Sequence, residues 1–249
     1  MLRRLELETD DGRIGQGGSG PHYMTATDGT KGVMKSTYFG GQSHPFLYLN
    51  EGLCALIALR LGVPVPEPYV LQLSLEQAHS FKPDATDADR FIFASQRIEP
   101  VEMLTPEIAA QADPRVLAGI VVLDALVWNT DRKDEHVLAE ASDEGWRIWA
   151  VDHGHTLVMG DTLDSLPDTD RDHPPFALLS SRLSFSDLEP WLAAVDEVQP
   201  EDFVDLVRSL PEQWLRDSDA PQRLARALYC RTGFLEQGLR NHVPPDRYT

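Results

Sequence analysis

The chain has 249 residues, 42% of them hydrophobic, which is typical of a globular protein with one or two cores. Its 40 acidic and 22 basic residues give a formal net charge of -18, whereas a face that binds nucleic acid needs clustered Lys and Arg. The composition therefore argues against a nucleic-acid partner. It does not exclude a small phosphate ligand, because one Lys and a metal ion can neutralise phosphate locally.

Cysteine usage and hydropathy indicate the compartment. Cys54 and Cys230 both stand in apolar helical patterns, which predicts buried free thiols in a reducing compartment. The first residues lack the apolar core of a signal peptide. The longest apolar stretch, residues 116–128, is interrupted by Asp124 and is too short to cross a bilayer. We therefore expect a cytoplasmic protein with no membrane partner.

The first hundred residues have the patterns of a β-rich unit with one helix. Strands are expected at residues 4–8, at 22–26 and 31–35 around an Asp28-Gly29 turn, at 69–75 and at 91–98. Apolar residues at helical spacing predict a helix over 50–63 that opens with Asn50 and Glu51 and is stopped by the prolines that follow. The polar connection over 76–89 is expected to be exposed and mobile.

From about residue 99 the pattern changes to helices. Thr105 before Pro106 predicts a capped helix, and residues 114–128 are apolar nearly all round, as a helix buried on most sides must be. Residues 136–152 resemble a hairpin of two short strands. The acidic stretch 161–175 is expected to be a mobile loop. Further helices are predicted near residues 186–197, 200–209, 211–216 and 220–241.

A glycine-rich stretch follows the first strand. It reads GQGGSG and contains Gly15, Gly17, Gly18, Ser19 and Gly20. A dinucleotide-binding turn would open a helix, but alternating residues follow here, so a flap between two strands fits better. Glycines let backbone amides approach phosphates closely because they have no Cβ. An ordinary glycine-rich hairpin loop is the alternative.

Lys35 ends the strand that follows the hairpin. A lone Lys at a strand end is usually a surface charge, but beside a glycine flap it can hold the α- and β-phosphates of a nucleotide if an anion positions it. Glu51 is the candidate anion, and we expect an ion pair between the two. The alternative role for Glu51 is to favour the helix N-terminus, an effect of about 0.5 kcal/mol.

The charged stretch WNTDRKDEHVL directly follows the apolar helix. Asp131 and His136 are five residues apart, the spacing of Asp-x-x-x-x-Asn in a kinase catalytic loop. Asp131 would orient the attacking hydroxyl, and Lys133 could reach the transferring phosphoryl group. After the predicted hairpin comes VDHG, in which Asp152 suits a hard cation that bridges phosphates. Each motif alone has a structural explanation, and their shared order favours the catalytic one.

With these motifs the sequence resembles the HipA-like kinases, a bacterial branch of the protein-kinase-like fold. The matching stretches are SGPHYMTATDGTKGVMK, NEGLCALIALRLGVPVPEP, LDALVWNTDRKDEHVL, WAVDHG and LPEQWL, which span almost the whole chain. The resemblance implies an α+β bilobal protein-kinase-like fold, with a β-rich N-lobe over 1–98 and a mainly helical C-lobe over 99–249. The hinge would lie near Arg97 and Ile98, whose backbone would meet adenine.

The resemblance also implies ATP and Mg²⁺ as cofactors and phosphoryl transfer to Ser or Thr hydroxyls of a protein substrate. Lys35 then contacts phosphate, Asp131 acts in catalysis and Asp152 binds metal. His136 departs from the family pattern, which has Asn as an oxygen ligand for a second metal. An imidazole suits Mn²⁺ better than Mg²⁺. Three interpretations of His136 follow: a metal preference shifted toward Mn²⁺, a substitute ligand such as Asp134, or a weakened enzyme.

Other functions stay open at this point. A catalytically silent pseudokinase would keep the fold and bind a nucleotide or a partner; His136 favours it, and Lys35, Asp131 and Asp152 oppose it. A nucleotidyl transferase on the same fold would hold the same triphosphate. A small-molecule hydroxyl could also be the acceptor.

Overall fold

The structure is a computed structural model that describes residues 2–15, 20–36, 44–158, 162–163, 166 and 175–245. Its first part is a closed five-stranded barrel in the order β1-β2-β3-β5-β4, in which β1 and β4 are parallel and the other neighbours antiparallel. The strands are β1 (Arg3–Arg13), β2 (His22–Ala26), β3 (Lys31–Lys35), β4 (Pro68–Gln72) and β5 (Phe91–Gln96). All five strands were predicted, with β1 longer than expected.

The β2–β3 hairpin turns where the sequence predicted. Gly29 has φ 84°, a conformation that favours glycine, and Asp28 accepts the Thr30 amide at 2.9 Å. Gly32 on β3 is also required, because a Cβ there would lie 2.4 Å from the Met24 side chain and 2.8 Å from the Ser95 carbonyl oxygen. The close packing of β3 against its neighbours sets the direction in which Lys35 leaves the strand.

Helix α1 (Leu47–Leu61) follows the barrel's first three strands. The prediction that it opens at Asn50 and Glu51 was wrong, since it begins three residues earlier at Leu47. Both residues therefore lie inside the helix, and Glu51 has no role at its N-terminus. Eleven of its 15 residues are buried, so the helix is surrounded by other elements on most sides. It ends at Gly62, whose φ of 84° allows its N–H to reach the carbonyls of the last turn.

The polar connection predicted between β4 and β5 is partly helical. It contains α2 (Leu75–Phe81), capped by reciprocal bonds between Ser74 and Gln77, and a 3-10 turn, η1 (Asp87–Arg90). The capping box supplies partners to the free amides of the first turn, a local signal that the polar composition concealed.

The rest of the chain forms helices and a small antiparallel sheet, as expected from its patterns. The sheet order is β6-β7-β8. The elements are β6 (Glu102–Met103), α3 (Pro106–Gln111), α4 (Pro114–Val127), η2 (Asp134–His136), β7 (Val137–Ser142), β8 (Gly145–Ala150), α5 (Ala177–Ser180), α6 (Phe185–Asp196), α7 (Pro200–Arg208), α8 (Glu212–Leu215) and α9 (Ala220–Arg240). Only the short β6, η2 and α5 were not predicted. The acidic stretch 161–175 lies mostly outside the described residues, and its mobility stays a prediction.

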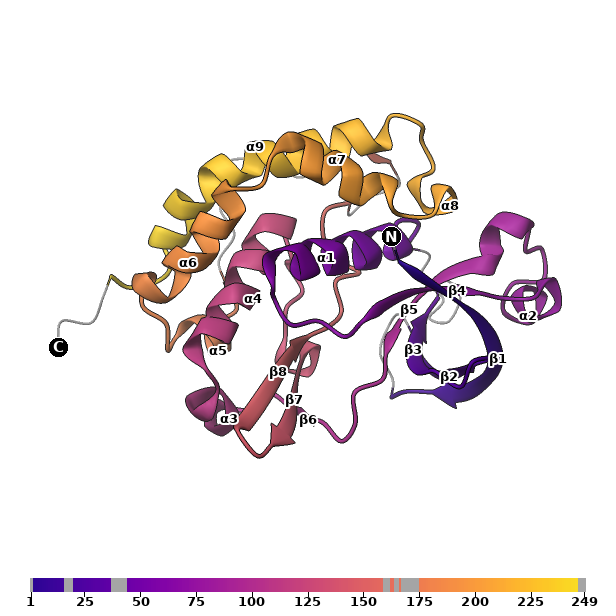
Figure 1. The fold of residues 1–249 in the computed structure, drawn as a ribbon, viewed down its shortest axis with the longest axis horizontal. Helices are drawn as coiled ribbons and strands as arrows, with labels where there is room; N and C mark the ends of the chain where they lie inside the picture. The colour runs from indigo at the N-terminus through magenta and orange to yellow at the C-terminus, as the bar shows by residue number, and fades with distance from the viewer. Residues whose placement is uncertain are drawn as a thin grey trace.

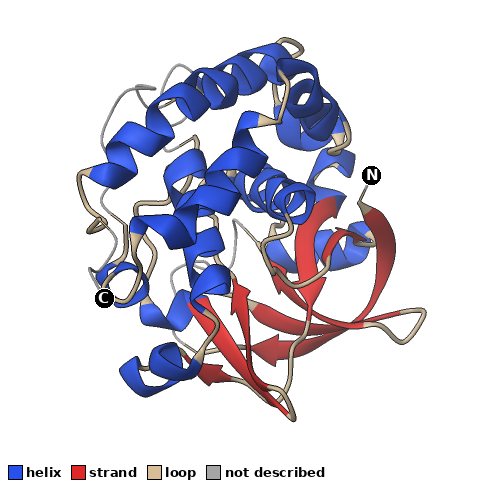
Figure 2. Ribbon diagram, turned by 60° about the vertical axis from the view of Figure 1, so that its left-hand side comes forward, coloured by secondary structure: helices blue, strands red, loops and turns tan. Residues whose placement is uncertain are grey.

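Figures 1 and 2 show most of the helices gathered on one side and the barrel on the other, with α1 between them; α2 lies on the outer side of the barrel (Figure 1). The described residues form two apolar clusters. The smaller fills the barrel and includes Ala78 of α2, and the larger joins α1 to α4 and the C-terminal helices. Through α1 the core of the helical half thus reaches the barrel.

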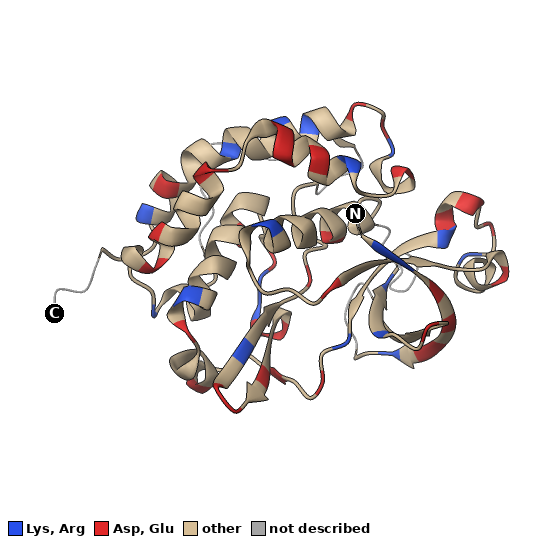
Figure 3. Ribbon diagram, in the orientation of Figure 1, with Lys and Arg blue, Asp and Glu red and all other residues tan. Residues whose placement is uncertain are grey.

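The charged residues of the surface agree with the acidic composition of the chain. Lys and Arg are scattered among the more numerous acidic residues (Figure 3). Within the described part of the chain, no helix combines the length and apolar character that a membrane crossing requires. Cys54 is buried as predicted, but Cys230 is exposed on α9, so that half of the prediction was wrong. Both thiols are free.

Candidate active site

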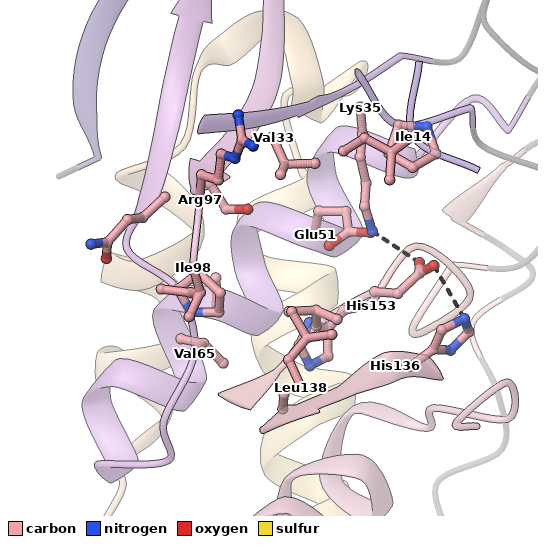
Figure 4. Close-up of a pocket in the computed structure, with 18 of the residues that line it drawn as sticks. Ile14, Val33, Lys35, Glu51, Val65, Arg97, Ile98, His136, Leu138 and His153 are labelled. Carbon is pink, nitrogen blue, oxygen red and sulfur yellow. Dashed lines mark hydrogen bonds and ion pairs between the residues drawn. The ribbon is translucent and has the colours of Figure 1, made fainter. Parts of the chain in front are cut away.

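A pocket of about 260 Å³ lies between the barrel and the β7–β8 hairpin. Its wall combines apolar side chains with a few charged ones, and Figure 4 shows them pointing toward one another from the two sides. The apolar lining residues include Ile14, Val33, Val65, Phe93, Ile98, Val101, Leu138, Ala150 and Val151. Concave, mainly apolar surfaces with a few convergent polar groups are typical of small-molecule sites.

Three charged residues from distant parts of the chain meet in this pocket. The Lys35 ammonium at the end of β3 pairs with the Glu51 carboxylate of α1 and lies 3.0 Å from Asp152 Oδ1, just after β8. All three side chains are largely enclosed. The predicted pair between Lys35 and Glu51 is therefore present, and Asp152 joins it.

The charges of this trio do not balance. Burial disfavours the Lys35 ammonium, but Asp152 and Glu51 outweigh that effect and raise its pKa above the ordinary value. Burial likewise acts against the Asp152 carboxylate, yet Lys35 holds the pKa of Asp152 well below its usual range. Burial, with repulsion from Asp152, raises the pKa of Glu51. Two carboxylates thus share one ammonium, and a bound cation would relieve their repulsion.

The backbone at Asp152 is unusual. Its φ is 60°, a left-handed conformation that few residues other than glycine and Asn or Asp adopt. Two residues later, a Cβ on Gly154 would lie 2.6 Å from the Leu47 side chain, so a larger residue would have to displace Leu47 for this segment to approach α1 so closely. Backbone strain of this kind concentrates at functional sites, and here it aims the Asp152 carboxylate into the pocket.

Two histidines lie beside Asp152. His136 Nε2 is 3.3 Å from Asp152 Oδ2, and in Figure 4 contacts from Lys35 and His136 converge on the same carboxylate. Burial lowers the pKa of His136 and brings that of His153 well below its ordinary value, so both imidazoles are neutral at pH 7. His136 Nδ1 and His153 Nε2 are buried without a hydrogen-bond partner among the described residues.

The charged loop begins where α4 ends. Trp128 closes the helix in a left-handed conformation with φ 56°, and Arg231 of α9 donates from Nε to the Ala125 carbonyl at 2.6 Å. Asp131 and Lys133 follow, and Lys133 Nζ lies 2.9 Å from Asp131 Oδ1. The Lys133 side chain is 51% exposed and the Asp131 side chain 36%. They do not belong to the pocket lining, but their exposure leaves them open to an incoming acceptor.

Arg132 points the other way, into the protein. Its guanidinium binds both carboxylate oxygens of Asp124 at 2.8 and 2.7 Å, and donates to the carbonyls of His136 at 2.7 Å and Val151 at 2.5 Å. Asn129 also donates to Asp124 at 3.0 Å. This buried network ties α4, the charged loop and the end of β8 together, and so fixes the backbone next to Asp152.

We expect Arg132→Leu to lower the free energy of unfolding by about 3–5 kcal/mol, because the buried Asp124 carboxylate would lose its only described cationic partner and keep only the hydrogen bond from Asn129. Urea unfolding measures the change. Arg115→Leu on the exposed face of α4 is the matched control and should stay within about 0.5 kcal/mol of the wild type. Replacing Asp124 and Arg132 together by Leu should recover part of the loss. An unchanged urea midpoint for Arg132→Leu would contradict the structural role.

The glycine flap connects β1 to β2, as predicted, and the Ile14 amide closes it by donating to the Pro21 carbonyl at 2.7 Å. Ile14 and Pro21 line the pocket, and Gly15 and Gly20 stand beside them. Gly15 and Gly20 have φ 60° and 49°. The candidates Gly17, Gly18 and Ser19 lie outside the described residues.

The predicted hinge residues also reach the pocket. Arg97 and Ile98 follow β5 and line it, with the Arg97 guanidinium 3.8 Å from the centre of the Tyr23 ring. Lys35, Glu51, Asp152, His136, Arg97 and Ile98 are thus brought together. Sequence reasoning missed Arg132 and its partner Asp124, and it did not assign a role to Asn50. The available signal was a polar residue inside an apolar helix, Asp124 in α4 and Asn50 in α1.

The fold has known relatives among protein-kinase-like structures. It is similar to the Helicobacter pylori proinflammatory kinase CtkA, with a TM-score of 0.57 over 95% of this chain and 98% of that chain at 12% identity. Weaker similarities are to a Golgi casein kinase with Mn/ADP bound (TM-score 0.49, 13% identity, 100% of this chain and 77% of that chain) and to hydra Fam20 with sugar (0.48, 12%, 99% and 89%). A comparison with curated proteins gives no match.

The barrel, the helices and the similarity to CtkA define a mixed α and β fold of the protein-kinase-like class. The sequence profile of the HipA-like kinases matches residues 11–147, more than half of the chain. The chain belongs to the HipA-like kinase family. This membership supports a phosphotransferase of the kinase type, and the family resemblance predicted from the motifs is confirmed.

Proposed function

We propose that the protein is an ATP-dependent kinase that transfers the γ-phosphoryl group to a Ser or Thr hydroxyl of a protein. The observation that carries this proposal is the meeting of Lys35, Glu51 and Asp152 in one pocket. These residues come from three elements far apart in the sequence. Kinases need this combination, because a Lys must be held by one carboxylate while a second carboxylate holds the cation on the triphosphate.

We further propose a bilobal organisation, with an N-lobe over 1–98 and a C-lobe over 99–249 and the nucleotide between them. The apolar wall formed by Val33, Val65 and Leu138 suits a purine ring. Ile98 supports the hinge assignment, since no hydrogen bond between described residues involves its backbone. A backbone amide and carbonyl at the pocket wall are thereby left for the base.

The donor atoms beside the pocket fit a divalent cation bound together with a nucleotide. Asp152 offers a carboxylate and His136 a neutral imidazole, and their shared site has excess negative charge. Within the described residues no three His, Cys, Asp or Glu side chains converge on a metal site. Phosphate oxygens and water would therefore complete the ligand shell. A nitrogen ligand favours Mn²⁺ over Mg²⁺. The cation would neutralise charge on the phosphates.

The chain's own residues would divide the remaining work. Lys35 would contact the phosphates, in a position maintained by Glu51, and the glycine flap would cover them with backbone amides. Asp131 would orient the acceptor hydroxyl and accept its proton. Lys133, 2.9 Å from Asp131, would approach the transferring group.

Lys35→Ala should weaken ATP binding by about 10- to 150-fold, the equivalent of the 1.5–3 kcal/mol of a hydrogen bond to a charged group. Calorimetry with ATP and Mn²⁺ measures the loss. Lys31→Ala, which removes the same charge from the exposed start of β3, should bind ATP like the wild type. Unchanged affinity and turnover in Lys35→Ala would show that Lys35 does not contact phosphate.

His136→Asn should increase activity with Mg²⁺ relative to Mn²⁺ several-fold, because an amide oxygen replaces the imidazole nitrogen. The measurement is the ratio of transfer rates with the two cations. Asp134→Asn tests Asp134 as a substitute ligand, and Asp143→Asn in the exposed turn between β7 and β8 is the control. An unchanged ratio for His136→Asn would leave His136 as a structural partner of Asp152.

Mass spectrometry of the purified protein and of candidate acceptor proteins, after incubation with ATP and Mg²⁺ or Mn²⁺, tests the reaction type. We expect the mass of a phosphoryl group to be added. Addition of an adenylyl group would indicate a nucleotidyl transferase instead. ATP binding without any transfer would indicate a pseudokinase, the alternative that His136 favours.

A further inference from the structure

Asn50 is the most highly connected polar side chain of α1. It is fully buried, and its Nδ2 lies 2.8 Å from the Gly154 carbonyl oxygen, 3.1 Å from that of Thr156 and 3.0 Å from that of Val158. Its Oδ1 accepts the Val158 amide at 3.3 Å. One side chain thus binds a segment more than a hundred positions away along the chain.

These contacts also determine the orientation of the carboxamide. Three carbonyl oxygens surround Nδ2, which has two hydrogens to share among them, while the one amide faces Oδ1. The reversed orientation would place Oδ1 against three acceptors. No other uncharged side chain of similar size can donate to these carbonyls and accept the Val158 amide at the same time.

The bound segment, residues 154–158, begins two residues after Asp152. Thr156 stabilises it further by donating from its hydroxyl to the His153 carbonyl at 2.7 Å, and it contacts Cys54 of α1 at 3.2 Å. Gly154 allows the close approach to α1 that these bonds need. The left-handed backbone of Asp152 is therefore held by a segment that α1 fixes in place.

We propose that Asn50 is a positioning residue: by holding residues 154–158 against α1, it keeps the Asp152 carboxylate in the orientation needed for a cation-bound nucleotide. The neighbouring Glu51 positions Lys35 at the same time. Two consecutive residues of one buried helix thereby set the phosphate-contacting Lys and the cation-binding Asp relative to each other. This inference rests on the proposed function.

The test compares Asn50→Leu with Gly52→Ala. Asn50→Leu has a similar volume and removes all of the bonds to the segment. Gly52→Ala disturbs another face of the same helix, because its Cβ would lie 2.7 Å from the Trp214 ring, and it leaves residues 154–158 untouched. If Asn50→Leu fails to fold, Asn50→Ser, which keeps a hydroxyl and leaves room for water, takes its place.

Two quantities are measured. The first is hydrogen exchange of the Val158 amide in the nucleotide-free protein by NMR, and the second is the Mn²⁺ concentration that gives half-maximal ATP binding. Replacing a residue that orients a metal ligand typically costs about 10- to 100-fold in metal affinity. We expect Asn50→Leu to raise the Mn²⁺ requirement by that factor and to speed Val158 exchange at least about 10-fold. Gly52→Ala should change neither quantity.

A wild-type Mn²⁺ requirement in Asn50→Leu would overturn the proposal, as would equal changes in both variants. Absence of ATP binding by the wild-type protein with either cation would instead contradict the proposed function. In that case Val158 exchange still decides whether Asn50 holds the segment.

Discussion

Asp152→Asn should abolish Mn²⁺-dependent ATP binding and lower phosphoryl transfer by about 10²- to 10³-fold, the loss seen when a group that stabilises transition-state charge is removed. The carboxylate faces Lys35 and His136 in the pocket, and its loss leaves the phosphate charge uncompensated before and during transfer. Asn is the suitable substitution, because it has the same shape and tolerates the left-handed backbone at this position.

Titration calorimetry with ATP and Mn²⁺, beside a transfer assay, measures both effects. Asp143→Asn is the charge-matched control, since Asp143 is exposed in the turn between β7 and β8, and it should bind ATP normally. Cation-dependent ATP binding that survives in Asp152→Asn would refute the cation site at Asp152.

Asp131→Asn should lower transfer by about 10²- to 10⁴-fold, the usual contribution of a general base, while ATP affinity changes by no more than about twofold. Asp131 lies on the exposed loop and outside the pocket lining, so its removal does not disturb the triphosphate. Its proposed role is exerted on the acceptor hydroxyl, and the loss is therefore one of positioning in the transition state.

The same two assays separate this variant from Asp152→Asn. Equal loss of ATP binding in both would contradict the division of roles between the two carboxylates. Full transfer activity in Asp131→Asn would contradict the kinase mechanism itself. Lys133→Ala is the companion, because it removes the only described ion-pair partner of Asp131 and keeps its carboxylate.

The charged loop illustrates how sequence and structure contribute differently. The sequence showed a charged run directly after an apolar helix, and the spacing of Asp131 and His136 indicated a catalytic loop. It did not show which side chains of that run point into the protein. In the structure Arg132 turns inward to Asp124, His136 turns to Asp152, and Asp131 stays outside. These directions depend on α4 and β8, which approach the loop only in the folded protein.

Elements whose determinants are local were predictable from the sequence. Turn chemistry at Asp28-Gly29 and the cap at Thr105 depend on neighbouring residues, and α4 is one apolar run that ends directly before the charged loop. The same reasoning failed at the start of α1, where apolar residues on nearly all faces give no periodic boundary, and at α2, whose polar composition concealed a capping box.

The sequence by itself therefore determined the order of the elements, the family motifs and the identity of Lys35, Asp131 and Asp152 as candidates. Tertiary structure alone decided that Asp152 joins the predicted pair of Lys35 and Glu51, and that Asn50 holds the segment after Asp152. The physical reason is the distance along the chain over which each feature is determined. Periodicity, caps and turns depend on residues within a few positions of one another. The charge balance of a buried site arises only when packing removes water from groups that the chain keeps far apart.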